Sequence, residues 1–98
     1  MLKKTYSKTG RVCRVTFRLP AEVQAEQAAL LGEFNDWDAA AAPMRRRKDG
    51  SFSLTLSLKS GRAYRFRYLL DGRRWENDWA ADAYVPNAFG AEDSVVQV

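Results

Sequence analysis

Hydrophobic and polar residues alternate along residues 51–58, SFSLTLSL, with the period of two that is typical of a β-strand with one buried face. Residues 13–19, CRVTFRL, repeat this pattern with arginine and threonine on the polar side. Both stretches are therefore predicted strands. Cys13 falls on the apolar side of the second one, so we interpret it as a small core residue and not as a reactive thiol.

A third alternating stretch, residues 63–70, AYRFRYLL, has an aromatic side and a basic side. Arg65 and Arg67 fall opposite the aromatic residues, and the stretch ends at Asp71-Gly72, a dipeptide typical of hairpin turns. We predict a strand that turns its aromatic residues to the core and its arginines outward.

Two other segments complete the predicted strands. The C-terminal SVVQV, residues 94–98, is rich in β-branched residues and is expected to close a sheet. Residues 20–31, PAEVQAEQAALL, begin with proline and good helix formers, which favours a helix. The alternation that follows favours a strand over about residues 27–33, and we adopt the strand because its neighbours are strands at sandwich spacing. Between Gly72 and Asp93, the abundance of Asn, Asp, Ala and Pro predicts long loops with at most a short strand.

About six to eight short strands in fewer than 100 residues predict an all-β fold, an immunoglobulin-like β-sandwich. An OB-type barrel is the main alternative. The chain has 98 residues, of which 46% are hydrophobic, so residues 1–98 are expected to form one stand-alone domain with a substantial core.

The composition excludes several kinds of site. Cys13 is the single cysteine and there is no histidine, so neither an internal disulfide nor a Cys/His zinc site can form, and no cofactor is expected. No apolar run is long enough to cross a bilayer, and no apolar stretch follows the basic N-terminus. We expect a soluble, cytoplasmic protein with no membrane partner.

The net charge of +4 is moderate for a nucleic-acid-binding protein. The densest basic run, RRRK at residues 45–48, precedes the turn dipeptide Asp49-Gly50 and is interpreted as the solvated end of a hairpin.

Catalysis is not expected. Without histidine, no nucleophile and base pair is visible. Carboxylates flank two tryptophans, and glycoside hydrolases use two such acids at a defined separation. These carboxylates, however, stand in turn-like segments where Asp accepts local backbone hydrogen bonds, and a domain of this size offers no deep cleft to raise a carboxyl pKa. These carboxylates are Asp36, Asp38, Glu76 and Asp78.

Large aromatic residues lie in segments that are predicted to be loops. Trp37 follows a Phe-Asn-Asp turn, Trp75 follows the DGRR turn, Trp79 comes four residues later, and Phe89 lies in NAFG. One such residue is best explained by plugging the core, but several of them near a basic strand face suggest a stacking platform for sugar rings or bases.

These residues also carry a family resemblance. The segments LLGEFNDWDAAAAPM, DGSFSLTLSLKSGRAYRFRYLLDGRRWENDW and FGAEDSVVQV resemble the family 48 carbohydrate-binding module, also called the isoamylase N-terminal or early set domain. The same module forms the glycogen-binding domain of the AMP-activated protein kinase beta subunit. The resemblance runs from about Arg11 to Val98 and implies an immunoglobulin-like sandwich that binds α-1,4-linked glucans such as glycogen and starch.

The resemblance also implies site residues. Trp37 and Trp75 match two tryptophans that stack on glucose rings, and Arg67 matches a basic residue that bonds sugar hydroxyls. Phe89 matches an apolar residue that wedges against the glucan, and Asp93 stands where the family has an asparagine that contacts a sugar hydroxyl.

The sequence departs from the family pattern at three places. The DGRRW turn is one residue longer than usual, Asp93 keeps an acceptor but loses the amide donor, and Trp79 stands where proline is frequent. Trp79 either extends the platform or packs.

The leading hypothesis is a non-catalytic module that binds α-glucan polysaccharide or maltooligosaccharides weakly, with a glycogen-metabolising enzyme as a further candidate partner. One alternative is a module that keeps the fold but serves protein interaction without sugar binding. The other is a single-stranded nucleic-acid binder that uses its aromatic residues together with four arginines, Arg65, Arg67, Arg73 and Arg74.

Overall fold

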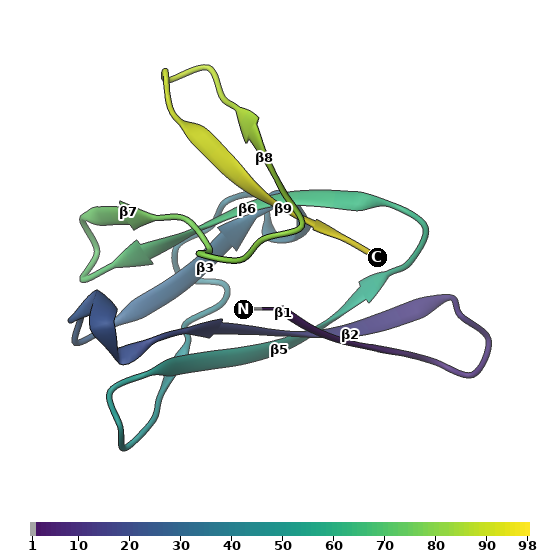
Figure 1. The fold of residues 1–98 in the computed structure, drawn as a ribbon, viewed down its shortest axis with the longest axis horizontal. Coiled ribbons are helices and arrows are strands. Elements are labelled where there is room, and N and C mark those ends of the chain that lie inside the picture. Colours follow the sequence, from purple (N-terminus) through teal and green to yellow (C-terminus); the bar gives the residue numbers. More distant parts are fainter. Residues whose placement is uncertain (1) are drawn as a thin grey trace.

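The computed structural model describes residues 2–98, which contain nine β-strands, two single-turn 3₁₀ segments and no α-helix (Figure 1). The strands are β1 (Leu2–Tyr6), β2 (Val12–Leu19), β3 (Ala28–Gly32), β4 (Arg45–Arg46), β5 (Phe52–Lys59), β6 (Ala63–Leu70), β7 (Arg74–Glu76), β8 (Ala83–Pro86) and β9 (Glu92–Gln97). The 3₁₀ segments are η1 (Ala21–Val23) and η2 (Glu33–Asn35). Within residues 2–98, no helix has the length and apolar character that crossing a membrane requires.

The strands form two antiparallel sheets. One sheet has the order β1-β2-β5-β4, and the other has the order β3-β6-β9-β8, with β7 paired to the last residues of β6. The chain passes from one sheet to the other next to β4: residue Pro43 bridges Ala29 of β3, and two residues later Arg45 pairs with Ser53 of β5. The predicted immunoglobulin-like β-sandwich is confirmed. The β8–β9 hairpin projects from its body (Figure 1).

The alternating stretches build the core between the sheets. Cys13, Val15, Phe17 and Leu19 of β2 are at most 1% exposed, and the aromatic side of β6 is buried against them, as predicted. Phe17 and Phe66 meet edge to face, with ring centroids 5.1 Å apart. Aromatic pairs of this geometry add to the stabilisation from burial.

Only some of the alternating apolar side chains of β5 are buried. Phe52 and Leu58 are buried at its ends, whereas Leu54 and Leu56 are partly exposed. The reason is the shortness of β4, which pairs with only two residues of β5 and leaves the middle of β5 at the edge of its sheet.

The predicted strand over residues 27–33 is confirmed as β3, and the helix signals before it produce only η1. The prediction of at most one short strand between Gly72 and Asp93 is wrong, because both β7 and β8 lie there. These strands have three and four residues, too few to display an alternation, and they form because β6 and β9 offer them free edges. They also bring the strand number to nine, above the expected six to eight.

The arginine-rich run before Asp49-Gly50 is a solvated hairpin end, as predicted. Arg45 and Arg46 form β4, and all four basic side chains of residues 45–48 are exposed.

Asp71 ties the β6–β7 turn to the segment before β3. Its Oδ1 accepts hydrogen bonds from the backbone N–H groups of Gln27 and Glu26, both at 2.9 Å. These two bonds, that of Gln27 first, hold the pKa of the Asp71 carboxyl below its ordinary value of 3.8.

We expect Asp71 to make the fold acid-sensitive in a defined window. Because its pKa is lower in the folded than in the unfolded chain, its contribution is present above the unfolded pKa and is lost as pH falls through the folded pKa. The Asp71→Asn variant should therefore be less stable than wild type near pH 7, and the difference should shrink as pH falls below about 5 and past the ordinary Asp value of 3.8. Thermal melts of both proteins across this range measure it, and a difference that stays constant with pH would contradict the assignment.

Candidate functional site

A groove of about 960 Å³ lies on the outward face of the β3–β6 sheet. Its lining comes from β3, β6 and β7, from the loop after η2, and from the tip of the β8–β9 hairpin. All five side chains predicted from the resemblance line it, namely Trp37, Arg67, Trp75, Phe89 and Asp93. Residues 56 positions apart in the sequence thus meet at one surface.

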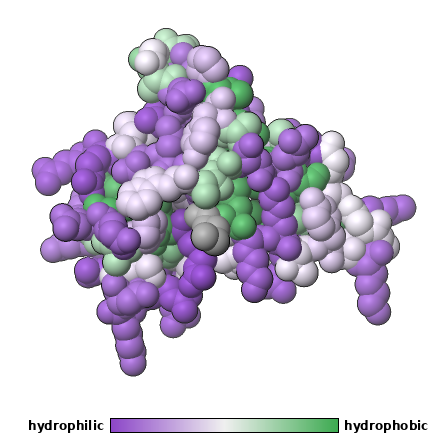
Figure 2. Space-filling model, in the orientation of Figure 1, coloured by the Kyte–Doolittle hydropathy of each residue, from purple (hydrophilic) through white to green (hydrophobic). Residues whose placement is uncertain are grey.

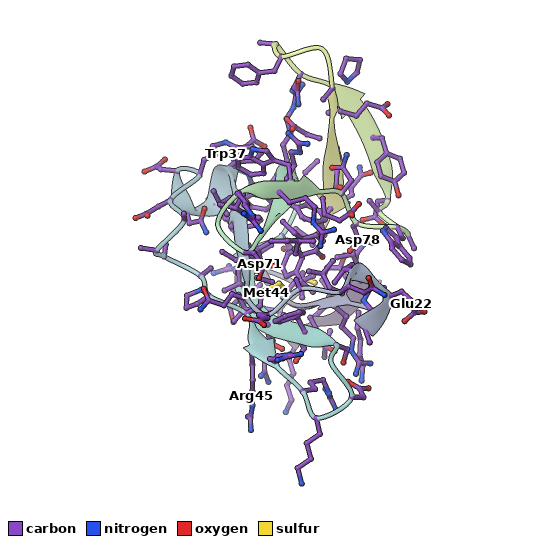
Figure 3. The ribbon with its side chains drawn as sticks, turned by 90° about the vertical axis from the view of Figure 1, so that its left-hand side faces the viewer. Glu22, Trp37, Met44, Arg45, Asp71 and Asp78 are labelled. Carbon is purple, nitrogen blue, oxygen red and sulfur yellow. The ribbon has the colours of Figure 1, made fainter. Side chains whose placement is uncertain are left out.

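The turn that carries Trp37 is built by the motif Gly-x-Phe-Asn-x-Trp. Asn35 closes it, because its Oδ1 accepts the Gly32 N–H at 3.0 Å and its Nδ2 donates to the Leu30 carbonyl at 2.9 Å. The Trp37 N–H then donates to the Gly32 carbonyl at 3.0 Å. Asp36 and Trp37 adopt φ values of 54° and 57°, a left-handed conformation that is costly for a tryptophan. The backbone is therefore held in a strained form that sets the half-buried indole beside the groove (Figure 3).

Trp75 enters the groove from β7 despite the longer turn before it. It pairs with Leu69, which also lines the groove, and its side chain is 45% exposed. The guanidinium carbon of Arg67 lies 5.0 Å from the centre of the Trp75 ring, within cation–π range. The contact sets the two side chains against each other on the outward face of the β6–β7 pair.

The Arg67 side chain also contains a hydrogen-bond donor that has no partner. Among residues 2–98, its Nε is the buried side-chain nitrogen or oxygen for which no hydrogen-bond partner is present. A buried donor without a partner costs about 1–3 kcal/mol, so the packing of Arg67 against the Trp75 ring carries an energetic cost.

Phe89 stands at the tip of the β8–β9 hairpin and is 90% exposed. Asn87, which sequence reasoning missed, shapes this tip: its Oδ1 accepts the N–H groups of Phe89 and Ala91, and its Nδ2 donates to Asp93 Oδ1 at 3.1 Å. An asparagine ahead of a Phe-Gly pair is a turn signal that could have identified it.

Asp93 has little exposed surface for a direct sugar contact. Its residue is 6% exposed, one carboxylate oxygen accepts from Asn87, and the other lies 3.8 Å from Arg65 Nη1. Asp93 thus holds the hairpin tip and Arg65 at the groove margin.

The charges of the groove are balanced. Arg65 and Arg67 face Glu33 and Asp93 in the lining, and Glu33 Oε1 accepts the Arg65 backbone N–H at 2.6 Å. The other two arginines of the nucleic-acid alternative, Arg73 and Arg74, lie outside the lining, and Arg74 donates to the Val23 carbonyl. A neutral groove does not attract a phosphate backbone, so this geometry disfavours that alternative.

Trp79 lies outside the groove lining and is 57% exposed. The structure thus leaves it neither in the platform nor in the core. The carboxylates weighed for catalysis are not gathered in the groove either, since Asp36, Asp38, Glu76 and Asp78 are absent from its lining.

Asp78 has a structural environment. It is 2% exposed, and its Oδ2 accepts the Tyr68 hydroxyl at 2.7 Å while its backbone N–H donates to Ser94 Oγ. Burial, and then the nearby Asp78 carboxylate, raise the pKa of the Tyr68 hydroxyl well above its ordinary value. This network fastens the segment after β7 to β9. Among the described residues, no group of three or more His, Cys, Asp or Glu side chains could hold a metal ion.

Structural comparison finds pullulanase from Paenibacillus barengoltzii among similar folds. The apo form is 26% identical with a TM-score of 0.52, a variant complexed with maltotriose is 24% identical with 0.54, and a variant complexed with maltotetraose is 24% identical with 0.53. The matches cover 96%, 99% and 96% of this chain, which spans only 14% to 15% of the pullulanase chains. No curated protein matches the sequence.

The family comparison covers most of the chain. Residues 5–85 match the model described as Carbohydrate-binding module 48 (Isoamylase N-terminal domain). This match includes the turn that carries Trp37, the three alternating strands and the β7 segment that carries Trp75. The chain therefore belongs to the carbohydrate-binding module 48 family.

Proposed function

We propose that the protein is a non-catalytic module that binds α-1,4-linked glucans through the groove on the β3–β6 sheet. The observation that carries the proposal is the convergence of Trp37, Trp75 and Phe89, from three separate segments, on one groove. Aromatic side chains that line a groove suit the apolar faces of sugar rings. The maltotriose and maltotetraose complexes of the similar pullulanase structures are in line with a ligand of this class.

Each residue has a proposed role. Trp37 and Trp75 stack on glucose rings, and Phe89 forms an apolar wall at the hairpin tip. The Arg67 guanidinium, which lines the groove, donates to a sugar hydroxyl oxygen. Asp93 completes the rim by holding Asn87 and Arg65 in place.

The expected affinity is weak. One aromatic face contributes at most about 1.5–3 kcal/mol before ordering costs, so two tryptophans and a few hydrogen bonds reach only several kcal/mol. This corresponds to millimolar to micromolar dissociation constants. Repeated sites on a branched polymer would raise the apparent affinity.

Native gels containing glycogen, amylopectin or a soluble cellulose derivative test the proposal. Retardation by the two α-glucans and not by the β-linked polymer is the expected result, and it should change little with salt because the ligand is neutral. Equal mobility in all gels at high polysaccharide concentration would refute α-glucan binding.

A second candidate function is docking beside a glycogen-metabolising enzyme. It is favoured by the small share of each pullulanase chain that the match covers, since the similar region there is joined to further polypeptide. We nevertheless propose that residues 1–98 bind glucan as one domain, because Trp37, Trp75 and Phe89 line a single groove. A cytoplasmic location remains an expectation from the sequence.

A further inference from the structure

The two sheets differ in charge. The strands of the β1-β2-β5-β4 sheet contain seven basic residues and no acidic residue: Lys3, Lys4, Arg14, Arg18, Arg45, Arg46 and Lys59. The strands of the other sheet contain three of each sign: Arg65, Arg67 and Arg74 against Glu76, Glu92 and Asp93. The excess positive charge of the strands thus belongs to the sheet that does not carry the groove.

Strand register decides which of these side chains point outward. Arg18, Ser53 and Arg45 stand in one row across β2, β5 and β4, on the face opposite the buried Phe17 and Leu19. By the same alternation, five basic side chains share this outward face and all are exposed: Lys3, Arg14, Arg18, Arg45 and Lys59. We call these five the basic face.

The residues between the five cations are small and polar. The other outward positions of this sheet are Thr5, Thr16, Ser53, Thr55 and Ser57, with Val12 at one end. Thr16 and Thr55 hydrogen-bond to each other across the strands at 2.9 Å, so their hydroxyl groups lie close to the sheet. The long basic side chains therefore extend farther from the sheet than the short hydroxyl side chains between them.

The spacing of the cations is wide. Arg14 and Arg18 are four residues apart on one strand, or about 13 Å, and Arg18 and Arg45 are two strands apart, or about 10 Å. The five cations are spread over four strands, so one small anion can engage only some of them. The basic face suits an extended array of negative charges.

The basic face lies on the side of the molecule away from the groove. Figure 3 shows Arg45 pointing away from the body, at the end opposite the β8–β9 hairpin and Trp37. In Figure 2, hydrophilic side chains project from the lower margin, where β5 lies in Figure 1. A partner bound here would leave the groove open.

The residue types on this face indicate which kinds of partner it can bind. No outward position of these strands is aromatic, so the bases of a single-stranded nucleic acid would find no stacking surface. A four-stranded sheet is also wider than the ribbon that enters a DNA groove. The centre of the face has no apolar anchor, unlike the core of a stable protein interface.

We propose that the basic face docks on a membrane surface that contains anionic lipids. Such a surface is broad, and its mobile headgroups can adjust to widely spaced cations, so neither a pocket nor an apolar anchor is needed. Arg47 and Lys48 of the adjoining turn add to the attraction. The sequence-based expectation of no membrane partner considered spanning segments and not this mode of association. The module would then bring a glucan bound on one side to a membrane on the other.

Vesicle sedimentation tests the proposal. Wild type should bind vesicles of mixed phosphatidylcholine and phosphatidylserine at low salt, lose most of this binding at high salt, and not bind phosphatidylcholine alone. The double variant Arg14→Gln and Arg45→Gln should bind the mixed vesicles about 25-fold more weakly, since each basic residue near an anionic surface contributes roughly a factor of five.

Two control variants make the result specific to the basic face. Arg62→Gln with Arg73→Gln has the same net charge, changes exposed turn residues outside this sheet, and should bind the vesicles like wild type. Arg14→Lys with Arg45→Lys keeps the charge and should also bind like wild type, which separates charge from folding. Equal loss in both glutamine variants, or binding to a DNA duplex without binding to vesicles, would overturn the proposal. Glucan retardation of the Arg14→Gln/Arg45→Gln variant reports on the groove separately and should match wild type.

Discussion

Replacing Trp37 with alanine is expected to weaken glucan binding by about 10- to 150-fold, because one buried aromatic face contributes about 1.5–3 kcal/mol. Thermal stability should change little. Trp37 lies outside the buried core cluster, and the hydrogen bonds that close its turn come from Asn35 and from the backbone. Affinity gels with amylopectin, paired with thermal melts, measure both quantities.

Trp79→Ala is the matched control. Trp79 is a loop tryptophan as well, but it is exposed and lies outside the groove, so its loss should leave glucan retardation unchanged. Full retention by the Trp37→Ala variant would remove Trp37 from the site. A variant that melts far below wild type would show instead that the indole plugs the core.

Replacing Gly32 with alanine is expected to destabilise the whole fold by about 2–3 kcal/mol, in the range of other overpacking substitutions. A Cβ at this position would stand 2.6 Å from the Arg65 carbonyl oxygen and 2.9 Å from the Phe66 Cβ. Both atoms belong to β6, which is held between β3 and β9, so β3 would have to move away. For a domain of this size the loss lowers the melting temperature by about 10 °C or more. Glucan binding should fall as well, because the Gly32 backbone closes the turn that carries Trp37.

Gly10→Ala separates close approach from backbone conformation. Gly10 has a φ of 72° with open space around it, so alanine there meets only the left-handed penalty of about 1 kcal/mol. Gly32 has a φ of −170°, which alanine adopts without strain. If Gly32→Ala proved no more destabilising than Gly10→Ala, the close packing of β3 on β6 would not be the reason for this glycine.

The core strands could be predicted because the alternation of apolar residues is a local property of the chain. Each of β2 and β6 buries one complete set of alternate side chains, so the pattern and the burial agree. In β5 the same pattern predicted more burial than occurs, because β4 covers only one end of it. The length of a neighbouring strand cannot be predicted from a strand's own residues.

The groove could be predicted in part. The resemblance gave its five residues, and all five line it, although sugar binding by them remains a proposal. Asn87 was missed because its role depends on hydrogen bonds to Phe89 and Asp93 that exist only once the hairpin has formed. The partners of Asp93 could not be predicted for the same reason, since its oxygens face Asn87 and Arg65 only in the folded hairpin.

The sequence by itself determined which side chains of β2 and β6 enter the core, where the turn before Trp37 forms, and that no internal disulfide or Cys/His zinc site is available, because these follow from local spacing and composition. The tertiary structure alone decided what depends on pairing between distant strands. The register of β2, β5 and β4 gathers the cations of the basic face, and the packing of β7 on β6 sets Trp75 against Arg67. Long-range pairing has no local signature, so the partners across a sheet become known only when the sheets are assembled.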